Sequence, residues 1–96
     1  MRGYFTGLVV AGIFATQVVA QDVQVWVQIE AQPTLAEAQE RLRDYASALP
    51  NVNGFTLESG WHAVALGPYA PDDAAQLLRT LRRDGLIPRD SFVALG

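Results

Sequence analysis

The sequence predicts an α+β domain with the element order β-α-β-β-α-β, in which two helices cover one face of a four-stranded antiparallel sheet. Two observations predict this fold. Segments with the period of strands and segments with the period of helices follow one another in that order. A strand-then-helix unit also occurs twice, beginning near Trp26 and near Trp61, and a shift of 37 residues lays Val27 on Val64. The length of 96 residues indicates a single domain.

The start of the chain differs in character from the rest. An apolar run over residues 7–15 is followed by two polar residues and then by the small residues Val18 and Ala20, at the positions that a signal peptidase reads. This pattern predicts an export signal over residues 1–20 and a mature domain over residues 21–96. An uncleaved membrane anchor is the alternative, but a span needs about 20 apolar residues and the polar pair interrupts this run.

The predicted mature domain is acidic and lacks cysteine. Beyond residue 20 the chain has six arginines and ten carboxylates, a formal charge of −4. Polyanions are poor partners for such a surface. Without cysteine there are no disulfides, no thiol catalysis and no thiolate metal sites, so the fold must depend on packing.

The first unit reads as a strand followed by a capped helix. Residues 23–31 alternate between β-branched residues and others, which predicts a strand with Trp26, Gln28 and Glu30 on its outer face. Thr34, with Glu37 three residues later, forms the capping-box pattern that begins a helix. We expect Pro50 and Asn51 to end this helix.

The second unit begins with a predicted hairpin. Residues 54–59 and 61–66 read as strands joined by a two-residue Ser-Gly turn, which would pair Thr56 with Ala63. We expect Gly67-Pro68 to end the second of these strands. On this pairing, the inner face of the hairpin holds Phe55, Leu57, His62, Val64 and Leu66. The outer face holds Thr56, Glu58, Trp61, Ala63 and Ala65.

The chain ends with a helix and a short strand. Pro71 and the two aspartates after it suit a first helical turn, and Gly85 is placed to end the helix. Residues 91–95 predict the last strand, with Val93 and Leu95 inward and Phe92 outward.

Helices on one face leave the other face of the sheet open to solvent. On the predicted pairing this open face gathers aromatic, amide and small residues, and our candidate binding residues are Trp26, Gln28, Glu30, Trp61, Ala63 and Phe92. The C–H face of a pyranose can lie on an indole, while an amide can both donate to and accept from hydroxyl or N-acetyl groups. The pattern therefore favours sugar binding. Packing of both tryptophans under the termini or on another chain is the alternative.

The two units, Val-Trp-Val-Gln-Ile and Trp-His-Ala-Val-Ala-Leu-Gly-Pro-Tyr, each followed by an alanine-containing helix, resemble a SPOR domain over about residues 23–95. The resemblance is most specific at Gly67-Pro68-Tyr69. It implies a β-α-β-β-α-β fold of the ferredoxin-like type and a place in the periplasm or cell envelope. It also implies binding to peptidoglycan glycan strands that lack stem peptides, as found at division septa. Gln28 matches the glutamine of the family's first-strand motif, and Trp26 matches the aromatic residue two positions before it.

Three residues depart from the family's pattern. Glu30 and Gln32 stand where a glycine and an aromatic residue are common, and Ala63 stands where an arginine or similar polar residue precedes the valine. Peptidoglycan glycan carries lactyl carboxylates, so we expect Glu30 and Glu58 to place negative charge beside them.

Other functional classes fit the residues less well. Catalysis is not expected, because His62 is the only histidine and falls on the predicted inner face, and no serine sits in a nucleophile-elbow pattern. Glu30 and Glu58 would be exposed acids on a flat sheet, without a pocket that raises one pKa. The acidic balance and the export signal oppose nucleic-acid binding. We expect no metal and no cofactor, and membrane contact only through an uncleaved signal segment. The alternative partner is an envelope protein bound at the same face, with glycan binding lost.

Overall fold

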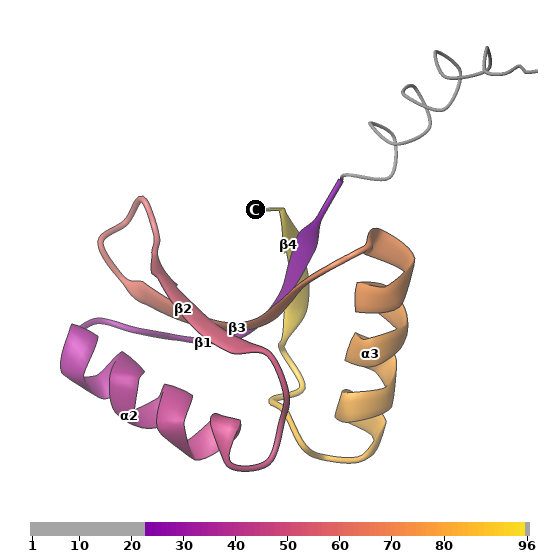
Figure 1. Cartoon of the computed structure of the whole chain (residues 1–96). Coiled ribbons are helices and arrows are strands. Elements are labelled where there is room, and N and C mark those ends of the chain that lie inside the picture. The colour runs from indigo at the N-terminus through magenta and orange to yellow at the C-terminus, as the bar shows by residue number, and fades with distance from the viewer. Residues whose placement is uncertain (1–22, 96) are drawn as a thin grey trace, which may run out of the picture.

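The computed structural model of the chain describes residues 23–95, which form one antiparallel sheet and two helices (Figure 1). The predicted export signal lies outside these residues. The elements are β1 (Val25–Gln32), α2 (Leu35–Ala46), β2 (Val52–Thr56), β3 (His62–Tyr69), α3 (Pro71–Arg83) and β4 (Phe92–Leu95). The strand order in the sheet is β2-β3-β1-β4. Both helices lie on one face, so the α+β fold with the order β-α-β-β-α-β is confirmed.

The helix boundaries follow local capping chemistry. The Thr34 hydroxyl accepts a hydrogen bond from the Glu37 backbone N–H at 3.2 Å, as the capping-box pattern predicts. At the end of α3, Gly85 has a φ of 73°, its N–H donates to the Arg82 carbonyl and the Leu86 N–H donates to the Leu81 carbonyl. These two bonds form the glycine cap expected there. The end of α2 differs from the prediction, because the helix stops at Ala46, ahead of the proline.

The core lies between the sheet and the helices. Its strand residues include Val27 and Val64, the pair that the internal repeat aligns, and both are fully buried. The helices contribute the buried residues Ala38, Ala74, Leu78 and Leu81. The inward placement of Leu95 was wrong, because this residue is 84% exposed. It ends an edge strand at a point beyond the cover of α3 (Figure 1).

The hairpin has a longer loop than the predicted two-residue turn. The Leu57 N–H donates to the Trp61 carbonyl at 2.8 Å, so residues 58–60 form a three-residue loop, and Gly60 has the positive φ of 92° that such loops place there. Phe55 consequently pairs with Ala63, one position away from the predicted register. Since a one-residue slip turns a strand over, Phe55 faces away from the helices.

β3 continues through Gly67-Pro68, which was expected to end it, and Tyr69 pairs with Val25. The chain has an extra residue here, where the peptide bond before the proline is cis. Gly67 has a φ of 136°, and a Cβ on it would lie 3.2 Å from the Val25 carbonyl oxygen, so only glycine fits this bulge. The sheet bends strongly, and its open face is concave between the hairpin and the N-terminal end of β1 (Figure 1).

Candidate functional site

A bulge in β1 changes which side of the sheet Glu30 faces. Gln28 pairs with Ala65, but Glu30 pairs with Val64, so β1 has one more residue than β3 in this interval. The extra residue puts Glu30 on the same side as Val64, which belongs to the core beneath the helices. The prediction that Glu30 lies on the open face was therefore wrong. Strict alternation along the strand could not reveal the bulge.

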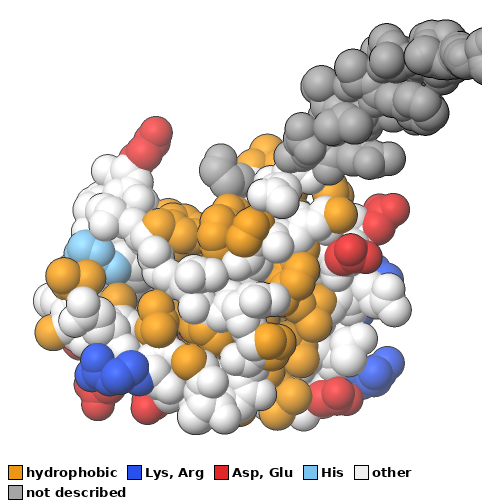
Figure 2. Space-filling view, viewed as in Figure 1, with side chains coloured by type: hydrophobic (Ala, Val, Ile, Leu, Met, Phe, Trp, Pro, Cys, Tyr) orange, Lys and Arg blue, Asp and Glu red, His pale blue; other side chains and the backbone are white. Residues whose placement is uncertain are grey.

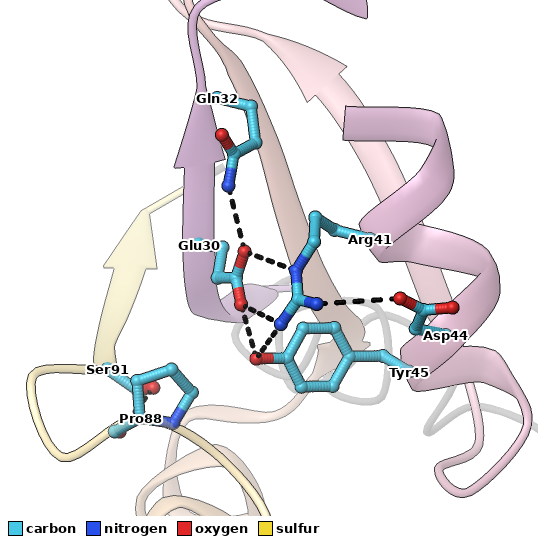
Figure 3. Close-up of polar contacts among 7 residues, drawn as sticks. All are labelled: Glu30, Gln32, Arg41, Asp44, Tyr45, Pro88 and Ser91. Atoms are coloured by element: carbon cyan, nitrogen blue, oxygen red, sulfur yellow. Dashed lines mark hydrogen bonds and ion pairs between the residues drawn. The ribbon is translucent and has the colours of Figure 1, made fainter. Parts of the chain in front are cut away.

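The Glu30 carboxylate is fixed by side chains of β1 and α2 (Figure 3). Arg41 binds it with two nitrogens, Nη2 to Oε2 at 2.7 Å and Nε to Oε1 at 3.0 Å. The Tyr45 hydroxyl donates to Oε2 at 2.5 Å, and the Gln32 amide donates to Oε1 at 3.0 Å. These four residues, which we call the Glu30 cluster, connect the end of β1 to α2. The side chain of Glu30 is 15% exposed.

Hydrogen bonds set the charge state of the Glu30 cluster. The bonds from Arg41, chiefly, and from Tyr45 and Gln32 lower the pKa of Glu30 from 4.5 to about 2, against the opposing effect of burial. Burial raises the pKa of Tyr45, and its bond to the carboxylate raises it further. Glu30 is therefore ionised and paired with a cation on the helical side. It does not add negative charge to the open face.

An aromatic pair forms across β3 on the open face. The ring centroids of Trp26 and Phe55 lie 5.4 Å apart, with 58° between the ring planes. The rings come from β1 and β2, which flank β3 and are separated by two strand spacings, about 9.5 Å. They can meet because β3 presents only Ala63 and Ala65 beneath them, and both alanines are 0% exposed. Ala63 was expected to contact a ligand, but it is covered.

Trp61 does not form the predicted surface with Trp26. It lies in the hairpin just before β3, is 47% exposed, and its backbone N–H donates to the Ser59 hydroxyl at 3.3 Å. Trp26 lies at the other end of β3, opposite the Gly67 bulge. The separation of about six residues along β3 corresponds to roughly 20 Å. The two tryptophans therefore belong to different parts of the open face.

A second part of the site lies where β4 begins. Gln28 pairs with Phe92, which is 50% exposed. Beside them is a pocket, here called the edge pocket, that is lined by Gln28, Ile29, Glu30, Ala31, Asp90 and Phe92. Because β4 pairs only as far as Gln28, the following residues of β1 have a backbone edge toward this pocket that β4 does not cover. Within residues 23–95, no hydrogen bond occupies the side-chain amide of Gln28.

Sequence reasoning missed two residues of this surface, Phe55 and Asp90. Phe55 was assigned to the core by the wrong hairpin register, and the glycine third in the loop was the signal that could have corrected it. Asp90 is placed by a turn in which the Ser91 N–H and hydroxyl both donate to the Pro88 carbonyl, at 3.1 and 2.7 Å (Figure 3). Ser91 is buried, so this turn holds Asp90 beside the edge pocket.

The open face carries apolar and amide groups, and its cations lie elsewhere. Hydrophobic side chains gather in the concave region between the hairpin and the start of β1 (Figure 2). Of the described arginines, five belong to α2 and α3, and Arg89 lies in the turn before β4. Among the acids, Asp90 and the arginine-bound Glu30 line the edge pocket, and Glu58 lies in the hairpin loop. This arrangement suits stacking and hydrogen bonding with an uncharged ligand.

Comparison of the chain with models of protein families, with curated proteins and with solved structures gives no match. Among residues 23–95, no three histidine, cysteine or acidic side chains group closely enough to hold a metal ion. In the same part of the chain, no helix is both long and apolar enough to cross a membrane. The candidate site consequently depends on the geometry of the open face, from the aromatic pair to the edge pocket.

Proposed function

We propose that this chain is an exported, non-catalytic SPOR-type module of the cell envelope. It binds peptidoglycan through the open face of its sheet, and the part it binds is glycan strands without stem peptides. The observation that carries the proposal is the pairing of Trp26 with Phe55 over two buried alanines. Such a pair presents ring surface in a concave region, where the C–H face of a sugar can stack.

Hydrogen-bonding groups next to the aromatic pair support the proposal. The Gln28 amide follows Trp26 by two positions on the same side of β1, and Phe92 adds a half-exposed ring next to it. A sugar that stacks on one ring can therefore reach an amide that both donates and accepts. The β-α-β-β-α-β fold and the ending Gly67-Pro68-Tyr69 are compatible with membership in the SPOR family.

Glu30, which stands where SPOR domains commonly have a glycine, interferes less with the proposed glycan binding than its position in the sequence suggests. In the Glu30 cluster this carboxylate is bound by Arg41 and Tyr45 on the helical side. It lines the edge pocket, but as the partner of Arg41 in an ion pair, so its repulsion of the lactyl carboxylates of glycan is reduced. Glu30 acts in our proposal as a residue that fixes β1 to α2, while Trp26, Gln28 and Phe92 remain as proposed contacts.

Co-sedimentation with cell-wall sacculi tests the proposed function. We expect the protein to sediment with sacculi, and to do so more strongly after an amidase removes the stem peptides. Trp26→Ala and Gln28→Ala should each lower the retained fraction, the first by about tenfold in affinity because a stacking surface is lost. Gln76→Ala, the same change on an exposed residue of α3, is the control and should bind normally. Absence of sedimentation with either material would eliminate the glycan proposal.

One observation favours a protein partner as the second candidate. Phe92 and Leu95 are both exposed on β4, which is an edge strand of the sheet. An exposed edge with apolar side chains is a surface to which another chain can add a strand. If an envelope protein is the partner, sacculi should not retain the protein. Phe92→Ala should then weaken association with the partner, while Trp26→Ala should leave it unchanged.

A further inference from the structure

From the amide groups on either side of the aromatic pair, we infer that the open face holds two consecutive N-acetylhexosamine units and binds the acetamido group of each. The inference rests on the proposed function, since it specifies how a glycan strand lies on the same face and which of its groups are recognised. It assigns Asn53, a residue outside the predicted site, as the contact of one acetamido group, and Gln28 as the contact of the next.

Two amides and two aromatic rings lie on crossing diagonals of the open face. Ala65 pairs with Asn53 of β2 on one side and with Gln28 of β1 on the other, so the amides are two strand spacings apart, about 9.5 Å. Phe55 follows Asn53 by two residues, and Trp26 precedes Gln28 by two. Because β1 and β2 run in the same direction, the line between the rings crosses the line between the amides above Ala65. The aromatic pair therefore has an amide on each flank.

The bulge at Gly67 fixes the amide of Asn53. Its nitrogen donates to the Gly67 carbonyl at 2.9 Å and to the Asn51 carbonyl at 3.3 Å. Both amide protons are used in this way, and Oδ1 remains as an acceptor. Asn53 is exposed and lines, together with both rings of the aromatic pair, a hollow of about 420 Å³, a size within the range of small-molecule sites. It therefore offers a ligand on this flank an acceptor that is already oriented.

An acetamido group matches these surroundings. Its N–H donates, which suits Oδ1 of Asn53, and its methyl group is apolar, which suits the adjoining rings. Successive sugars of a β-1,4-linked strand are turned over, so their acetamido groups project to opposite sides. A strand that stacks along the aromatic pair would direct one acetamido group to Asn53 and the next to Gln28, which both donates and accepts.

This arrangement is consistent with a preference for glycan without stem peptides. The lactyl group that carries a stem peptide is attached to the sugar carbon next to the one that carries the acetamido group. A stem peptide would therefore hinder the approach of that group to an amide on the flank of the pair. The contacts themselves involve neutral groups only, so they do not require the lactyl carboxylate to be masked.

The test compares two neutral oligosaccharides with the same β-1,4 linkage, the tetramer of N-acetylglucosamine and the tetramer of glucose. Both can stack on aromatic rings, but only the first has acetamido groups. Binding is followed by tryptophan emission in a Trp61→Phe background, in which Trp26 is the only tryptophan of the chain. We expect the acetylated tetramer to bind about 10- to 30-fold more tightly, because it gains a contact with each amide.

Variants separate this inference from the proposed function. Asn53→Ala and Gln28→Ala should each reduce the preference for the acetylated tetramer to about 3-fold. Gln76→Ala, the same loss of an amide on an exposed residue of α3, should keep the full preference. The preference is a ratio of two affinities in one protein sample, so partial unfolding of a variant does not change it.

The outcomes distinguish the two claims. Equal binding of the two tetramers, failure of the acetylated tetramer to bind, or an unchanged preference in Asn53→Ala would overturn the inference. If amidase-treated sacculi still retain the protein in these cases, the proposed function stands. If the sacculi do not retain it, the proposed function is overturned as well.

Discussion

The side chains of Trp26 and Phe55 meet across a strand to which neither belongs. Their ring centroids are 5.4 Å apart although β3 lies between their strands. The contact requires that the side chains of β3 be small at this point. Ala63 and Ala65 meet the requirement, and both are covered completely. The composition of a central strand thus determines whether two aromatic residues of its neighbours can form one surface.

The aromatic pair should act as a unit in binding. Phe55→Ala removes the ring that supports Trp26, so we expect weaker retention on amidase-treated sacculi and a red shift of the Trp26 emission as the indole becomes more exposed. Trp61→Ala is the control, since that residue lies in the hairpin and has no described contact with the pair. Equal losses of retention in the two variants would contradict the assignment of the site to the pair.

The space beneath the aromatic pair should be sensitive to size. Ala65→Leu inserts a branched side chain at a position that is completely covered, and we expect the free energy of unfolding to fall by about 1 to 3 kcal/mol. Ala36→Leu makes the same change on an exposed position of α2 and should alter stability by less than about 0.5 kcal/mol. Urea unfolding of both variants measures the difference. A similar stability for both would mean that the pair does not depend on a small residue below it.

The Glu30 cluster should make stability depend on pH in the acid range. The pKa of Glu30 is about 2 in the folded protein and 4.5 ordinarily, so the folded state favours the ionised carboxylate. Its contribution, about 2 to 3 kcal/mol, is complete above pH 5 and is lost as the pH falls from 4.5 to 2. Unfolding by urea at a series of pH values measures this loss.

A variant identifies which carboxylate is responsible for this pH dependence. Glu30→Gln should be less stable than the natural protein at pH 7, and the difference between the two should shrink toward pH 2. Tyr45→Phe removes one donor and should lower stability at pH 7 by about 1 kcal/mol. If the difference between Glu30→Gln and the natural protein stays constant with pH, Glu30 does not have the lowered pKa.

The bulge at Gly67 should tolerate no side chain. Gly67→Ala combines a positive φ with a Cβ that would lie 3.2 Å from the Val25 carbonyl oxygen, and we expect a loss of about 3 kcal/mol. Gly85→Ala also has a positive φ, but a Cβ there meets nothing within 4 Å, so its loss should be about 1 kcal/mol. Thermal unfolding compares the two variants. A larger effect at Gly85 would show that backbone conformation, rather than the contact with β1, dominates.

Features that depend on a few neighbouring residues could be predicted from the sequence. The Thr34 cap and the Gly85 cap are formed within a single helical turn, and both are present as predicted. The faces of Trp26 and Gln28 were also predicted, because regular alternation holds over that part of β1.

Features that depend on strand pairing could not be predicted in the same way. Phe55 and Glu30 were each assigned to the wrong face, the first by a loop one residue longer than expected and the second by an inserted residue in β1. In both cases a shift of one residue moves the side chain to the opposite face of the sheet. The alternation of residue types along the strand does not reveal such a shift. Asp90 was missed because its position depends on where β4 stops pairing, which the sequence of β1 does not determine.

The bulge between Gln28 and Glu30 divides β1 into two halves with separate duties. Before the bulge, Trp26 and Gln28 face the open side of the sheet, where a ligand can bind. After it, Glu30 faces the helices and binds Arg41 of α2. Changes that retune recognition at Trp26 or Gln28 therefore leave the anchoring of the helix untouched. One additional residue in the strand thus allows new ligand preferences to evolve without a concurrent cost to folding.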